Sequence, residues 1–81
     1  MDYETFNLWL ATFLRACHVL YVETTLTHHN KTVFHFQKDD RIPALVDSYL
    51  RGASVDVRDI ETAYKFLVSE IRKVRNGGGS L

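Results

Sequence analysis

The sequence has only one cysteine, Cys17, and this scarcity excludes two kinds of site. A lone thiol has no partner for an intramolecular disulfide, and zinc sites built on thiolates need more than one cysteine. Both absences favour a reducing compartment. We therefore predict a cytoplasmic protein that holds no structural metal.

Long apolar runs are also missing, since no stretch approaches the ~18 residues that a membrane-spanning helix needs. The start, Met1-Asp2-Tyr3-Glu4, carries acidic residues where a signal peptide carries Lys or Arg. These features predict a protein with neither a secretion signal nor a membrane as its partner.

Neither sign of charge is in excess, because ten basic and ten acidic side chains cancel. The molecule as a whole then lacks the positive field that draws proteins to phosphate backbones. Any contact with nucleic acid would need a local basic patch.

Motifs of known catalytic or metal chemistry are absent: there is no glycine-rich phosphate loop, no GxSxG and no HExxH. Cys17 next to His18 resembles half of a thiol nucleophile site, but adjacent residues at a helix end point in different directions. His28, His29 and His35 match no metal-ligand spacing, and we interpret them as solvated hairpin histidines. The sequence predicts no enzyme, no cofactor and no metal site.

The chain does contain enough apolar material for one core, with 46% hydrophobic residues in 81. A chain of this length has room for a single core. We predict one domain over residues 1–76. Residues 77–81, Gly-Gly-Gly-Ser-Leu, predict a flexible tail.

Helical spacing of apolar residues from Phe6 to Cys17 predicts a first helix, with Thr5 as its N-cap. Leu8 points away from the apolar face of this helix. That face comprises Phe6, Trp9, Leu10, Phe13, Leu14 and Cys17.

A second helix is predicted from about Ile42 to Arg51, because Pro43 suits a first turn and Gly52 suits a left-handed C-terminal cap. Asp39 and Asp40 come just before this helix, and we interpret them as capping residues, because acidic side chains are favourable at a helix N-terminus. The inner face comprises Leu45, Val46, Tyr49 and Leu50.

A third helix is predicted from Val57 to about Asn76, with Asp56 and Asp59 at its acidic start. Phe66 projects away from its apolar stripe. That stripe comprises Val57, Ile60, Ala63, Tyr64, Leu67, Val68, Ile71 and Val74.

Two strands are predicted between the first two helices, His18–Thr27 and Thr32–Gln37, and they form an antiparallel hairpin. Large side chains of the two strands share one face if Leu26 lies opposite Phe34. This register leaves a loop of about three residues around Asn30. Asn is a residue type that suits the left-handed conformation of such a loop. The first strand's inner face would comprise Leu20, Val22, Thr24 and Leu26.

These elements predict a small α+β domain of order α-β-β-α-(β)-α, in which three helices cover one face of the hairpin. The optional strand is Ser54-Val55, which is long enough only for a bridge or an edge strand. On the exposed face of the hairpin, His35 and Thr25 should lie together.

Several core-type motifs resemble those of a small uncharacterised domain-of-unknown-function family of bacteria, plasmids and phages. The likeness spans roughly residues 6–71, and what it implies concerns the fold, since the family brings no catalytic residues. The motifs are Leu8-x-Leu10-Ala11, Val33-Phe34-x-Phe36, Leu45-Val46-x-x-Tyr49-Leu50-x-Gly52-x-x-Val55-x-Val57, Ala63-x-Lys65-x-Leu67 and Ile71.

Our leading hypothesis is a non-enzymatic protein-interaction module of phage or mobile-element type. It would mask a surface on a host or element-encoded protein, and an inhibitor of a defence system such as a CRISPR effector fits the context that the resemblance implies. Leu8 and Phe66, the two apolar residues outside their helical patterns, and Lys73 are the expected partner-binding residues. A homodimer is a further option.

The alternative is a nucleic-acid-binding accessory protein that uses the basic end of the third helix. One side of that helix could follow a phosphate backbone, although basic residues are common in a last helical turn for electrostatic reasons alone. The expected residues are Lys65, Arg72, Lys73 and Arg75.

Overall fold

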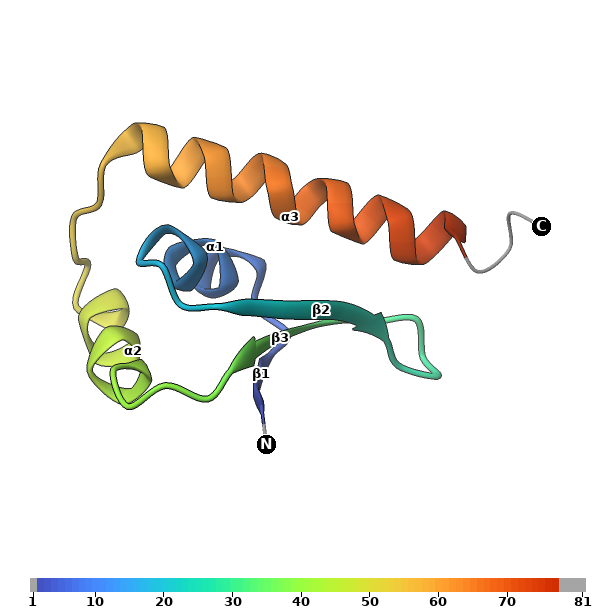
Figure 1. Cartoon of the computed structure of the whole chain (residues 1–81), viewed down its shortest axis with the longest axis horizontal. Coiled ribbons are helices and arrows are strands. Elements are labelled where there is room, and N and C mark those ends of the chain that lie inside the picture. The colour runs from blue at the N-terminus through green and yellow to red at the C-terminus, as the bar shows by residue number, and fades with distance from the viewer. Residues whose placement is uncertain (1, 78–81) are drawn as a thin grey trace.

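The structure is a computed structural model that describes residues 2–77. Over this range it confirms an α+β domain with an antiparallel hairpin and three helices (Figure 1). The predicted tail lies outside the described residues from position 78 onward. The elements are β1 (Asp2–Thr5), α1 (Leu8–Ala16), β2 (Tyr21–Leu26), β3 (Thr32–Gln37), α2 (Ile42–Leu50) and α3 (Val57–Gly77).

The first element, β1, was not predicted. It pairs antiparallel with β3, and the sheet order is β1-β3-β2. Thr5 belongs to this strand, so the prediction that it caps the first helix is wrong. Asn7 is the N-cap, and its Oδ1 accepts hydrogen bonds from the amides of Trp9 and Leu10 at 2.9 and 3.1 Å. Ser54-Val55 forms no strand.

The hairpin register differs from the prediction by two residues, since Thr24 rather than Leu26 lies opposite Phe34. A shift of two keeps the side chains of Thr24 to Leu26 on their expected faces. The connection is longer than predicted because the Thr27 hydroxyl accepts hydrogen bonds from the His29 and Lys31 amides, both at 3.2 Å. Asn30 has the expected left-handed conformation, with φ 62°.

A β-bulge between Tyr21 and Glu23 changes which side chains of β2 enter the core. Tyr21 packs against it, whereas Leu20 and Val22 are 64% and 46% exposed. The predicted inner positions of these two residues are therefore wrong. His18 adopts φ 66° and forms part of a turn rather than a strand.

The helices α1 and α3 lie on one side of the sheet (Figure 1). The first half of α3 passes over α1, and its second half runs along β2. At one end of the sheet α2 packs against α1, where the rings of Phe13 and Tyr49 are 5.6 Å apart. The main core cluster comprises Leu10, Ala11, Phe13, Leu14, Val19, Phe34, Phe36, Ile42 and Leu67.

Four residues on the predicted inner faces of the helices are also exposed: Phe6, Trp9, Leu50 and Val57. Phe6 precedes α1 because β1 occupies the start of the chain. Leu50 and Val57 are the last residue of α2 and the first of α3, where one neighbouring helical turn is missing.

The predicted cap of α2 is confirmed. Gly52 has φ 80°, and its amide donates to the Tyr49 carbonyl at 3.0 Å while the Ala53 amide donates to the Ser48 carbonyl at 2.9 Å. This pair of hydrogen bonds is a Schellman motif. Among residues 2–77, no helix has the length and apolar character to cross a membrane.

Candidate functional site

The two apolar residues expected to lie outside the core, Leu8 and Phe66, are half-buried and pack against it. The Phe66 ring meets Tyr21 edge-on at 5.0 Å, and the guanidinium of Arg15 lies 3.9 Å above it. The prediction that they project outward is wrong. For Phe66 the reason is that Tyr21 of β2 and Arg15 of α1 both reach its ring. The hypothesis that Leu8 and Phe66 bind a partner depended on their exposure, and this support is lost.

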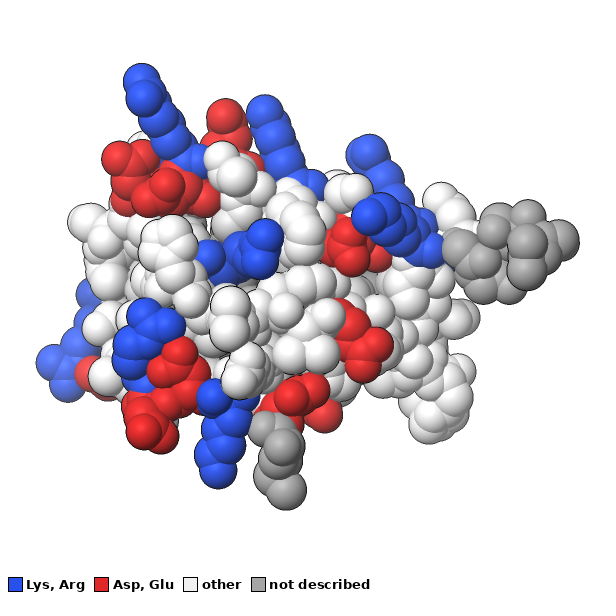
Figure 2. Space-filling model, in the orientation of Figure 1, with Lys and Arg blue, Asp and Glu red and all other residues white. Residues whose placement is uncertain are grey.

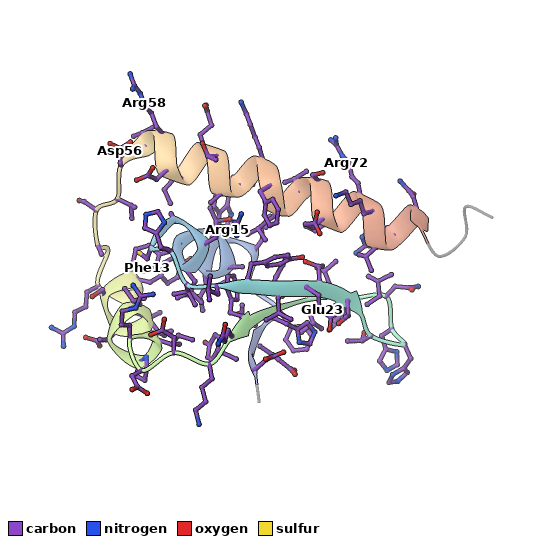
Figure 3. All side chains as sticks on the ribbon, in the orientation of Figure 1. Phe13, Arg15, Glu23, Asp56, Arg58 and Arg72 are labelled. Atoms are coloured by element: carbon purple, nitrogen blue, oxygen red, sulfur yellow. The ribbon has the colours of Figure 1, made fainter. Side chains whose placement is uncertain are left out.

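The predicted basic residues lie on α3, where Figure 2 shows acidic side chains among the lysines and arginines. The Lys65 ammonium is 3.7 Å from Glu61, and the Lys73 ammonium is 3.0 Å from Glu70. The Arg75 guanidinium donates to the Asn30 carbonyl at 3.1 Å. Arg72, labelled in Figure 3, is exposed. Neighbouring carboxylates therefore reduce the positive potential of this face.

Cys17 is half-buried and lies at the C-terminal end of α1. Burial raises the pKa of its thiol, and the nearby Arg41 opposes this with a smaller lowering effect. The neighbouring His18 is exposed. Within residues 2–77, no hydrogen bond joins the thiol to the imidazole, so the pair lacks the geometry of an activated nucleophile.

The three hairpin histidines separate into two environments. His28 and His29 are exposed with ring centroids 3.9 Å apart, as expected for solvated loop residues. His35 is half-buried and confirms its expected neighbour, since its Nε2 lies 2.8 Å from the Thr25 hydroxyl. Its Nδ1 lies 3.5 Å from Glu4 of the strand β1. The described residues contain no cluster of three or more metal-ligating side chains.

The order Glu4, His35, Thr25 resembles the acid, base and alcohol of a hydrolase. However, none of the three residues lines the cavity beside Arg15 and Asp59 or the one beside Tyr3 and Ile42. A nucleophile needs an adjacent place for a substrate. We interpret this row as a polar contact that joins the three strands across the sheet.

A groove of about 470 Å³ lies between the first residues of β1 and the beginning of α2. We call it the β1–α2 groove. Its apolar wall is formed by Tyr3, Ile42, Pro43 and Val46, and its charged rim is formed by Asp2, Lys38, Asp39 and Asp40. An apolar cleft with a few polar groups at its rim is the usual form of a binding site.

One rim carboxylate is already occupied. Asp39 forms a salt bridge of 2.8 Å with Arg41, and hydrogen bonds from the Arg41 guanidinium and amide lower the pKa of Asp39. Asp2 and Asp40 are exposed and make no ion pair within the described residues, and the same holds for Lys38, so the rim has two unpaired carboxylates and one unpaired ammonium there. The available charge of the groove is therefore acidic.

Two residues that line the groove, Asp2 and Tyr3, belong to β1, an edge strand of the sheet. Among residues 2–77, β1 pairs only with β3, so its other side presents unpaired backbone groups. Sequence reasoning missed the groove because it missed β1. The alternation of exposed Asp2 and Glu4 with inward Tyr3 and Thr5 was the available signal.

Comparison with known proteins gives one match. The family model described as "Domain of unknown function (DUF5659)" matches residues 1–77. No curated protein and no solved structure matches the chain. The expected resemblance to a domain-of-unknown-function family is thereby confirmed, and the match extends over more of the chain than expected.

Proposed function

We propose that this chain, which belongs to the DUF5659 family of domains of unknown function, is a non-enzymatic protein-interaction module that binds an extended segment of a partner protein in the β1–α2 groove. The observation that carries the proposal is the combination of an apolar wall, an acidic rim and an open strand edge in one place.

Each of the three features selects for part of the ligand. The open edge of β1 favours an extended backbone, because a bound strand can hydrogen-bond to it. The wall of Tyr3, Ile42, Pro43 and Val46 favours an apolar side chain, which gains free energy when it leaves water. The carboxylates of the rim favour Lys or Arg beside that apolar residue.

The narrower hypothesis, an inhibitor of a host defence system encoded by a phage or mobile element, concerns the identity of the partner. It stays a prediction. The expected residues Leu8, Phe66 and Lys73 do not line the groove, and the groove replaces them as our proposed contact surface.

The test is selection from a library of random short peptides, followed by affinity measurement on the purified chain. We expect the selected peptides to combine Lys or Arg with an aliphatic or aromatic residue. The variant with Asp2→Lys and Asp40→Lys should bind them about 5-fold or more weakly, as expected for rim charges.

The matched control is Glu61→Lys, which reverses an exposed carboxylate on α3 outside the groove. It should change the affinity less than 2-fold. Peptides without a basic preference, or equal weakening in both variants, would contradict the proposal. Retention of DNA or RNA that is lost on reversing Arg72, Lys73 and Arg75 would favour the nucleic-acid alternative instead.

A further inference from the structure

Arg15 has an unusual environment for a charged side chain. It is half-buried near the end of α1, and its guanidinium carbon lies 3.9 Å from the centre of the Phe66 ring and 5.8 Å from that of Tyr21. Within residues 2–77 it makes no ion pair and donates no side-chain hydrogen bond. Stacking occupies a flat face of the guanidinium, so the N–H groups at its edge are left to bind something else.

The same arginine lines a cavity of about 320 Å³ between α1, the connection to β2 and the beginning of α3. Val19 and Ala63 give it an apolar floor, being 1% and 3% exposed. Asp59 and Thr62 line it from the first turns of α3. Figure 3 shows Arg15 on α1 beneath the first half of α3.

The cavity is lined by two side chains of opposite charge that form no salt bridge with each other. Arg15 and Asp59 both line it, and no ion pair joins them within the described residues. A guanidinium binds a carboxylate through two parallel hydrogen bonds, whereas a carboxylate such as Asp59 binds an ammonium. A molecule with one of each group therefore offers a partner of opposite charge to each of these two side chains.

We propose that this cavity is a binding site for a small zwitterion of the amino-acid type, with its carboxylate on Arg15 and its ammonium on Asp59. The Thr62 hydroxyl offers a further hydrogen bond, and the apolar floor accommodates a short side chain. The volume lies at the small end of the range for ligand sites, ~300–1,000 Å³. Phosphate is disfavoured because Asp59 repels a second negative charge.

The proposal is tested by titrating the isotope-labelled chain with alanine, acetate, ethylammonium and inorganic phosphate, each followed by amide chemical shifts. Alanine should shift amides of the cavity lining and bind at least about 5-fold more tightly than the other three, because it alone engages both charges. Equal binding of acetate or phosphate would overturn the assignment, as would shifts outside the cavity or none at all.

Two variants separate the charges. Arg15→Met keeps an unbranched side chain over Phe66 but removes the guanidinium, and it should weaken alanine binding about 10-fold or more. Asp59→Asn alters an exposed residue and should reduce the preference for alanine over acetate to less than 2-fold. Arg58→Gln, next to Asp59 but outside the lining, is the control and should bind as the parent does.

If Arg15→Met does not fold, the Asp59→Asn result decides the matter alone. An unchanged preference for alanine in Asp59→Asn, or the same loss in Arg58→Gln, would overturn the proposal.

Discussion

The indole of Trp9 lies flat against the ring of Tyr64, with centroids 5.0 Å apart and an angle of 11° between the planes. Trp9 is 55% exposed, so this contact rather than burial explains an aromatic residue at that position. It joins the first turn of α1 to the first half of α3.

We expect the two rings to stabilise the fold jointly. Trp9→Ala and Tyr64→Ala should each lower the free energy of unfolding, and the double variant should lose less than the sum of the two. The difference is the coupling energy, and stacked pairs give about 0.5–1.5 kcal/mol. Urea denaturation followed by circular dichroism measures all four free energies. A coupling energy near zero would show that the rings act independently.

The elements that the sequence predicted best have strong local signals. Phe34 and Phe36 alternate with His35, and the strand Thr32–Gln37 has the predicted bounds. Pro43 and Gly52 mark the two ends of α2, because a fixed φ suits a first turn and a positive φ suits a cap.

The elements that were missed depend on distant contacts. The strand β1 has four residues and exists because it pairs with β3, which is distant in the sequence, as in Tyr3 opposite Phe36. Because of the bulge beside Val22, Tyr21 faces the core in place of Leu20 and Val22, and no local sequence pattern predicts the bulge. Phe66 is covered only because Tyr21 and Arg15 reach it. The groove could not be predicted without β1.

Gly52 offers a direct test of backbone conformation. It has φ 80°, and a Cβ placed there would meet no atom within 4 Å. Gly52→Ala should therefore cost only the strain of a left-handed residue, about 1–2 kcal/mol. Gly52→Asn should cost less, because Asn tolerates this region. Denaturant midpoints compare the three proteins, and an Ala variant as stable as the parent would contradict the conformational argument.

The thiol of Cys17 should react slowly with a thiol reagent in the folded protein. Burial raises its pKa and therefore lowers the thiolate fraction at neutral pH. The labelling rate of the native chain, measured against that of the urea-unfolded chain at the same pH, should be at least several-fold lower. Equal rates would mean an accessible thiolate and would revive the hypothesis of a Cys17–His18 nucleophile.

Arg41 links the loop before α2 to the end of α1, because it holds Asp39 and also donates hydrogen bonds to the carbonyls of Cys17 and His18, both at 3.3 Å. The lowered pKa of Asp39 makes this link sensitive to acid. A carboxyl whose pKa is lower in the folded state stabilises the fold above its unfolded pKa of ~3.9, and the stabilisation disappears as the pH falls through the folded value.

We therefore expect Asp39→Asn to be less stable than the parent at pH 6–7. The difference between the two proteins should shrink below about pH 4 and vanish in stronger acid, where Asp39 is protonated in both states. Denaturation curves over a pH series measure it. The control, Asp40→Asn, alters the neighbouring exposed carboxylate, which makes no ion pair within the described residues. A difference for Asp39→Asn that persists unchanged at pH 2 would mean that the side chain acts through shape or capping rather than through its charge on Arg41.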